Sequence, residues 1–126
     1  QKGEIMPKNA RQTRQQMRAQ TAYSCVLSAE KELKEKKAED YAQLAKKFPA
    51  LVHNCGLAQA IAFVQAKEGE TGGSYISHLA KTMGETGDLA DSCRTAPLMK
   101  YQRLTREAIE SATWIKRYSE ALLETD

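Results

Sequence analysis

The chain has 126 residues, of which 41% are hydrophobic and 28% are charged, and its formal net charge at pH 7 is +3. This length suits one domain with a modest core, and no apolar run is long enough to span a membrane. The first twenty residues are polar and basic and lack the apolar centre of a signal peptide. Cys25, Cys55 and Cys93 lack the paired spacing of a disulfide framework or a zinc site. We therefore expect a cytoplasmic protein with reduced thiols.

The positive charge is concentrated in two stretches. Residues 1–18 hold five basic residues and one acid, and residues 94–117 hold six basic residues and two acids, so each stretch carries +4. The segment between them carries −2 and the last nine residues carry −3. Such patches attract polyanions, of which phosphate backbones are the commonest in a cell. The alternative is that the basic residues only form a solvated helix face.

Residues 1–7 are expected to form a tail, and a helix is predicted from Lys8 to about Lys37. Its buried stripe recurs at spacings of three and four and consists of Ala19, Ala22, Val26, Ala29 and Leu33. Four cations with the same spacing lie upstream, on a portion with almost no large apolar residue: Lys8, Arg11, Arg14 and Arg18. A helix end with little to bury and much positive charge is either frayed or bound to a partner.

The central segment predicts two helical pieces that meet at a fixed corner. A helix over residues 38–47 is followed by Pro49, which is expected to break or kink it. The Asn54-Cys55-Gly56 triplet predicts a helix stop, because glycine adopts left-handed backbone angles without steric cost. The next helix is expected to end near Lys67, and the three glycines in residues 68–73 predict a loop.

The C-terminal part predicts a short helix and then a long one. Ser74 is the expected N-cap of the short helix, which ends between residues 84 and 88. Residues 89–93 suit one or two further turns, and Thr95 with Pro97 is expected to start a helix that runs to about Glu124. The buried stripe of this last helix is predicted to comprise Leu98, Tyr101, Ala108, Ala112, Ile115 and Leu122, with Leu104 and Ile109 at its margins.

No segment alternates with a period of two, so we predict an all-α fold: a single compact bundle of about five to six helices over residues 8–126. Its expected core comprises Leu57, Ile61, Val64, Ile76, Leu79, Tyr101, Ala108, Ala112 and Ile115. No glycine-rich phosphate loop, nucleophile motif or metal-ligand spacing is present in the sequence. We therefore expect no enzymatic activity, no metal or other cofactor, and no small-molecule substrate.

Two stretches resemble a known family. FPALVHNCGLAQAIAFVQAK at 48–67 is similar to a pattern of proline, aliphatics, a polar pair and Gly-Leu-x-Gln-x-Leu-Ala-Phe. YQRLTREAIESATWIKRYSEALL at 101–123 is similar to Tyr-x-x-Leu-Thr-Arg-Glu-Ala followed by Trp-aliphatic-Lys-Arg. Both patterns belong to the small helical fifth subunit of type III-B CRISPR effector complexes, the Cmr module. The departures are Ile61 in place of the usual leucine and a short segment at 68–73.

The resemblance implies a non-catalytic, all-helical subunit in antiviral defence. It also implies that several copies stack beside the backbone subunits that hold the guide RNA, and line the groove for the target RNA. The expected partners are therefore other Cmr subunits, further copies of this chain, and RNA through its phosphate backbone. Together with the two basic stretches, it predicts nucleic-acid contacts at Lys8, Arg11, Arg14, Arg18, Lys46, Lys47, Arg103, Arg106, Lys116 and Arg117.

The rival hypothesis is a helical protein–protein adaptor that does not bind nucleic acid. Convergence of the N-terminal arginines with Arg103 and Arg106 on one face would favour RNA binding, and dispersal would favour the adaptor. For Trp114, packing between helices is favoured over base stacking, because aromatic residues act mostly through buried area. Lys46 and Lys47 end the predicted second helix, where cations complement the helix dipole, and phosphate contact is the alternative there.

Overall fold

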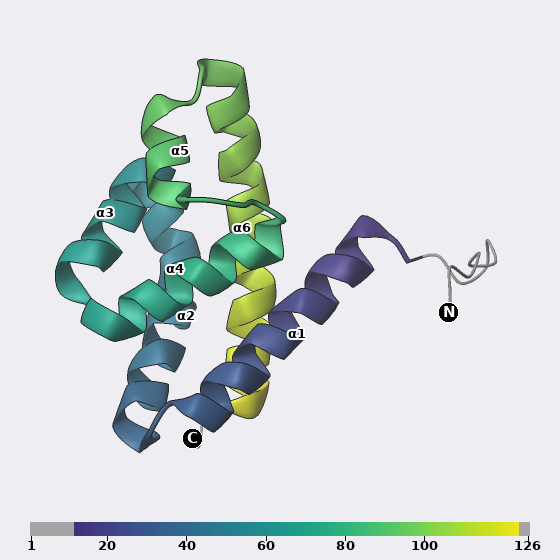
Figure 1. Ribbon diagram of the computed structural model, residues 1–126, viewed down its shortest axis with the longest axis vertical. Coiled ribbons are helices and arrows are strands. Elements are labelled where there is room, and N and C mark those ends of the chain that lie inside the picture. The colour runs from purple at the N-terminus through teal and green to yellow at the C-terminus, as the bar shows by residue number, and fades with distance from the viewer. Residues whose placement is uncertain (1–11, 124–126) are drawn as a thin grey trace.

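A computed structural model describes residues 12–123, and within this range the chain forms six helices and no strand. The helices are α1 (Arg14–Glu32), α2 (Glu35–Cys55), α3 (Leu57–Lys67), α4 (Gly69–Met83), α5 (Leu89–Thr95) and α6 (Leu98–Leu122) (Figure 1). This confirms the predicted all-α bundle. None of these helices combines the length and the apolar character needed to cross a membrane. The expected tail, Lys8 and Arg11 lie outside the described residues.

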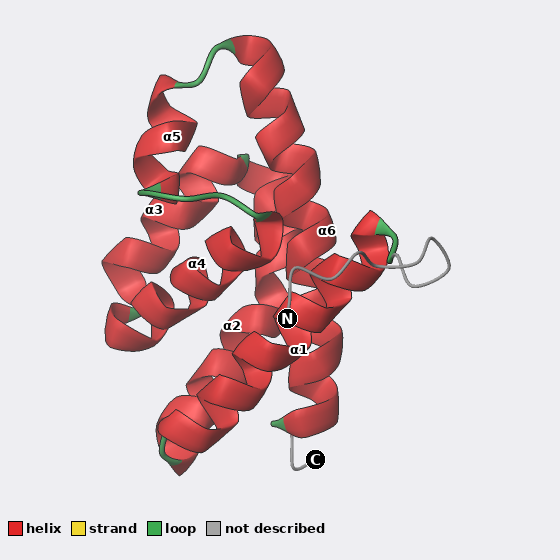
Figure 2. Cartoon of the chain, turned by 45° about the vertical axis from the view of Figure 1, so that its right-hand side comes forward, coloured by secondary structure: helices red, strands yellow, loops and turns green. Residues whose placement is uncertain are grey.

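Helix α6 runs along the long axis of the bundle and packs against α1, α2 and α4 (Figure 1). Helix α1 crosses α6 obliquely, and short loops connect the helices (Figure 2). At one end of α6, the Tyr101 hydroxyl accepts a hydrogen bond of 3.0 Å from the Ala58 amide of α3. This bond satisfies one of the unpaired amides at the start of α3, and it fixes the α2–α3 corner against α6.

The predicted core residues are buried, with one exception. Leu57, Val64, Leu79 and Ile115 are fully inaccessible to solvent, as their common helical spacing predicts. Tyr101 is only half-buried, because its hydroxyl reaches the α3 amide at the edge of the core. The largest buried side chains include Tyr41, Phe48 and Tyr75, whose rings pack against one another.

Helix α1 is shorter than predicted at both ends. It begins at Arg14 because Thr13 and Gln16 form a capping box, in which each side chain accepts a hydrogen bond from the other residue's backbone amide. It ends at Glu32 rather than near Lys37, because Leu33 has an extended backbone and packs against the core. This break lets α2 begin at Glu35.

The prediction of a break or kink at Pro49 is wrong as regards the break, since α2 continues through Pro49 to Cys55. Proline removes one intrahelical hydrogen bond, but the apolar face of α2 continues on both sides of it. Phe48 and Val52 are both buried. Packing of this apolar face contributes more to the stability of the helix than the helix propensities of its residues. The predicted stop is confirmed at Gly56, whose φ of 86° suits glycine.

The predicted loop at residues 68–73 is wrong, because α4 begins at Gly69 and only Glu68 joins it to α3. Ser74 is therefore inside α4 and is not its N-cap. A Cβ atom on Gly72 would lie 2.7 Å from Glu68 Cβ and 2.8 Å from Val64 Cγ1. The absence of a side chain at Gly72 thus allows the start of α4 to pack closely against the end of α3.

The start of α6 also differs from the prediction. Thr95 ends α5, and Pro97 is the N-cap of α6. Leu98 is 70% exposed rather than part of the buried stripe, whereas Leu104, expected at the margin, is fully buried. The first turn of α6 lies at one end of the bundle, where few other helices cover it (Figure 1).

Candidate nucleic-acid interface

The solvent-facing side of α6 carries three of the predicted arginines. Arg103, Arg106 and Arg117 are exposed. Together with Glu110 they are spaced by three, four and seven residues, which places all four on one side of the helix. The buried side of α6 is opposite and contains Leu104, Ala108, Ala112 and Ile115. We call Arg103, Arg106, Glu110 and Arg117 the α6 outer face. It extends over about 21 Å at 1.5 Å per residue and has a net charge of +2.

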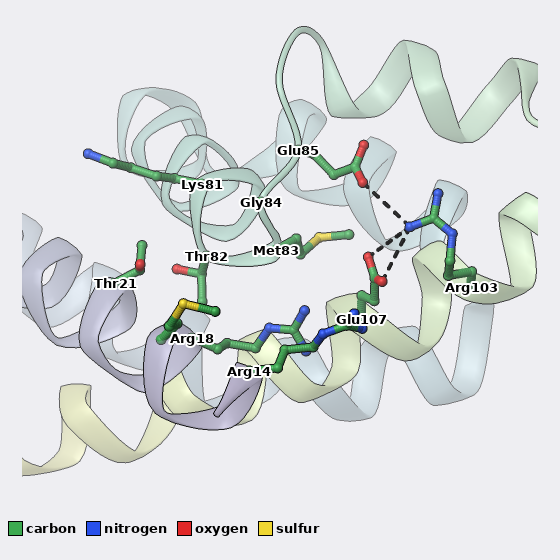
Figure 3. A pocket seen from close by; sticks show the side chains of 11 residues that line it. Arg14, Arg18, Thr21, Lys81, Thr82, Met83, Gly84, Glu85, Arg103 and Glu107 are labelled. Carbon is green, nitrogen blue, oxygen red and sulfur yellow. Dashed lines mark hydrogen bonds and ion pairs between the residues drawn. The ribbon is translucent and has the colours of Figure 1, made fainter. Parts of the chain in front are cut away.

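A pocket of about 370 Å³ opens between α1, α4 and α6 beside this face. Arg14, Arg18 and Arg103 line it together with Lys81 and several neighbours (Figure 3). Three of the predicted cations therefore converge on one hollow. Lys46, Lys47, Arg106, Lys116 and Arg117 do not line this pocket.

Two carboxylates of the pocket hold Arg103. Its Nη1 atom lies 3.2 Å from Glu107 Oε1 and 3.8 Å from Glu85 Oε2 (Figure 3). These ion pairs orient the guanidinium, and the two carboxylates offset its positive charge locally, but the Arg103 side chain remains 44% exposed. Arg14 has no ion pair with any residue from 12 to 123 and is exposed. Arg14 is therefore the better placed of the two for a phosphate.

Arg18 is a buried member of the predicted basic stripe. Arg18 is only 7% exposed, and its Nη1 donates a hydrogen bond of 2.6 Å to Glu110 Oε1. Residue 18 lies one turn before the buried Ala22, on the side of α1 that packs against α6. Its Nε atom is buried without a hydrogen-bond partner among the described residues. We infer that Arg18 serves mainly to hold α1 against α6.

The two lysines near the end of the predicted second helix lie in the interior of α2 instead, because α2 extends to Cys55. They are therefore too far from its C-terminus to complement the helix dipole there. Lys47 forms an ion pair of 3.0 Å with Glu68 and lies 5.6 Å from the centre of the Phe63 ring. Lys46 is exposed, Lys116 is half-buried, and neither has an ion pair within residues 12–123.

Sequence reasoning missed residues that the fold brings to this region. Lys81 reaches the pocket from α4, and Glu85 from the loop after it. Tyr23 of α1 packs edge-on against Tyr118 of α6, and the two ring centres are 5.3 Å apart. Pairings between α1 and α6 cannot be read from either helix alone, since the sequence of one helix does not indicate which residues of the other it meets.

The titratable groups with shifted pKa values lie elsewhere, mainly between α2 and α4. Burial lowers the pKa of His78, whose Nδ1 is 2.7 Å from the Tyr41 hydroxyl, and burial raises the pKa of Tyr41. Burial also raises the pKa of Cys93 to about 11, so its thiol is protonated at neutral pH. Within residues 12–123, no three His, Cys, Asp or Glu side chains are grouped so that they could hold a metal ion.

Comparisons with known proteins agree over nearly the whole chain. A family model described as "CRISPR-associated protein (Cas_Cmr5)" matches residues 14–122. The CRISPR system Cmr subunit Cmr5 of Thermus thermophilus is 41% identical over 114 residues, which cover 89% of this chain and 97% of that protein. The crystal structure of a CRISPR-associated Cmr5 family protein from the same organism has a TM-score of 0.81 at 38% identity and covers 90% of this chain and 100% of its own. The chain therefore belongs to the Cas_Cmr5 family of CRISPR-associated proteins.

Proposed function

We propose that this protein is a non-catalytic structural subunit of a type III-B Cmr effector complex, in which several copies stack beside the backbone subunits and line the groove for the target RNA. Membership of the Cas_Cmr5 family supports association with other Cmr subunits. The observation that carries the RNA contact is the α6 outer face, where Arg103, Arg106 and Arg117 are exposed and Arg103 shares the α1–α6 pocket with Arg14.

The contacts with RNA are proposed to be electrostatic and independent of sequence. Arginine side chains on a solvent-facing helix side bind phosphate oxygens, which carry no base information. One copy offers few such contacts, so its affinity is expected to be micromolar or weaker. Stacked copies would join their basic faces and raise the effective affinity without any new contact. Arg14, Arg103, Arg106 and Arg117 are the proposed main contacts, with Lys46, Lys47 and Lys116 as secondary ones.

Reversing Arg14 and Arg106 together to glutamate is expected to weaken the binding of single-stranded RNA to the isolated chain, because two of the proposed phosphate contacts are removed. Both side chains are exposed, so the fold should persist. For the unmodified chain, the logarithm of the affinity should fall with the logarithm of salt concentration, with a slope of about −0.7 per phosphate contact. Fluorescence anisotropy of labelled oligouridylate over a salt series measures both quantities.

The matched control reverses Lys31 and Lys67 to glutamate. These lysines are also exposed and have no ion pair within the described residues, and they lie outside the pocket and the α6 outer face. The control makes the same change in net charge. If both double variants weaken binding equally, only net charge matters, and an RNA surface made of Arg14 and the α6 outer face is excluded.

The two ends of the bundle support the proposed stacking. At one end, Leu98 and Met99 are 70% and 81% exposed, next to the exposed Lys100. At the other end, Leu33, Leu122 and Leu123 line a pocket of about 340 Å³ with the acidic residues Glu30, Glu35 and Glu39. These surfaces complement one another in apolar character and in charge. A contact between unlike ends repeats from copy to copy, as an open stack requires.

Met99→Glu is therefore expected to reduce the number of copies of this chain in each assembled complex. The new carboxylate would face the acidic pocket of the next copy and would leave a charge at an apolar contact. The stability of the single chain should not change, because Met99 is 81% exposed. Native mass spectrometry counts the copies, and Ala66→Glu, an exposed position on α3, is the control. An unchanged copy number would exclude this contact.

A further inference from the structure

Three aromatic side chains gather on the surface where α1 meets α6. We call Tyr23, Trp114 and Tyr118 the aromatic cluster. The Trp114 and Tyr118 rings are stacked with centres 5.8 Å apart and an interplanar angle of 22°, and Tyr23 packs edge-on against Tyr118. Tyr23 is 43% exposed, and the other two are half-buried. The other packed ring pairs within residues 12–123 involve the core residues Tyr41, Phe48 and Tyr75, with His78 beside Tyr41.

The orientation of Trp114 is fixed. Its indole Nε1 donates a hydrogen bond of 2.9 Å to Gln15 Oε1 of α1, and Tyr118 lies against its ring. The polar group of the indole is therefore satisfied within the chain, which leaves the ring surface as the part available to a partner. A fixed aromatic ring loses little conformational entropy when a flat group stacks on it.

The surroundings of the cluster are basic. Trp114 is three residues before Arg117 on α6, so the two side chains are neighbours on the helix surface. From Arg14 to Ala29, α1 contains Arg14 and Arg18 and no acidic residue. Glu110 is the acidic neighbour of Trp114 on α6, and it is already paired with Arg18. A partner at this surface should therefore carry both negative charge and flat apolar groups.

We propose that the aromatic cluster stacks a base of a single-stranded RNA whose phosphates lie along the α6 outer face. This inference rests on the proposed function and adds to it a contact with the bases, where the arginines alone would contact phosphates. Positive grooves combined with aromatic platforms are the general means of binding single strands, because every base has a face that can stack. The contact tolerates any sequence. Apolar protein partners would also fit the rings, but the excess of arginine over acid favours the polyanion.

Trp114 is the single tryptophan of the chain, so its fluorescence reports on this site alone. Addition of oligouridylate to the full chain should quench this fluorescence, and an abasic ribose-phosphate oligomer of equal length should bind without quenching it. Trp114→Leu should weaken oligouridylate binding by about 5- to 150-fold, which corresponds to 1–3 kcal/mol per stacked base. The slope of affinity against salt should stay the same, because no phosphate contact is removed.

Trp114→Phe is the matched variant, since it loses the bond to Gln15 as the leucine variant does but keeps an aromatic face. It should retain most of the affinity, and a difference between the two variants isolates stacking from packing. If Trp114→Leu does not fold, two measurements still decide the result. They are the quenching of the unmodified chain by oligouridylate but not by the abasic oligomer, and the affinity of the phenylalanine variant for oligouridylate.

Binding of oligouridylate without quenching, and with equal affinity in the leucine variant, would overturn the base contact and leave the proposed electrostatic RNA surface intact. No binding of either oligomer by the unmodified chain would instead overturn the RNA surface itself. If Trp114→Leu binds RNA normally but no longer joins the assembled complex, the cluster is a protein contact and the proposal is wrong.

Discussion

Replacement of Ile115 by aspartate is expected to unfold the chain. Ile115 is fully buried in α6, the helix that packs against α1, α2 and α4. The substitution removes a large apolar side chain from the core, which costs about 2–5 kcal/mol, and it buries a carboxylate that has no partner there. The sum is comparable with the whole stability of a small domain, about 5–15 kcal/mol.

Circular dichroism during urea titration measures this loss. Arg117→Asp, two residues further along α6, is the control because Arg117 is exposed. It should change the free energy of unfolding by about 0.5 kcal/mol or less. A cooperative unfolding transition for Ile115→Asp close to that of the unmodified chain would contradict the buried position of Ile115.

Arg18→Glu is expected to destabilise the chain by about 3 kcal/mol or more, whereas Arg14→Glu should have almost no effect. Arg18 is buried and paired with Glu110, so its reversal removes the ion pair, brings two carboxylates together and buries one of them. Glu110 is 54% exposed and can turn away. This limits the repulsion between the two carboxylates, but the new carboxylate at position 18 would still be buried. Arg14 lies one turn earlier and is exposed.

The comparison of these two variants isolates the effect of burial and ion pairing on stability, because the residue type, the helix and the change in charge are the same. Their melting temperatures, measured side by side, give the difference directly. Equal and small effects would mean that Arg18 is not held at the α1–α6 contact. A low-stability Arg18→Glu variant also could not be used to test RNA binding, and so Arg14 and Arg106 are the residues to reverse in binding experiments.

Helical periodicity predicted much of the fold. The stripes of α3 and α6 identified Ile61, Val64, Ala108 and Ile115 as core residues, and all are buried. The errors lie where packing between helices overrides a local signal. Pro49 does not end α2 because its apolar face continues on both sides. The glycines after Lys67 predict a loop when the segment is read alone. Gly72 instead allows a close approach to Val64, and this contact involves two helices and cannot be read from one segment.

The candidate interface was predictable only as a list of charges. The sequence indicates which residues are basic, and the spacing within α6 places Arg103, Arg106 and Arg117 together. It does not indicate that Arg18 has a partner 92 residues away in Glu110. The role of Trp114 was open for the same reason, since Gln15, Tyr23 and Tyr118 meet it only when α1 crosses α6.

Capture of target RNA by a reconstituted Cmr complex tests the proposed lining of the RNA groove most directly. Complexes would contain the unmodified chain, the Arg14→Glu/Arg106→Glu variant, or the Lys31→Glu/Lys67→Glu control, with equal copy numbers verified by native mass spectrometry. The first double variant should weaken target capture and flatten its salt dependence, and the loss should exceed that for the isolated chain because stacked copies multiply the contacts. Unchanged capture and salt slope in the complex would contradict the proposal and identify these arginines as a solvated surface.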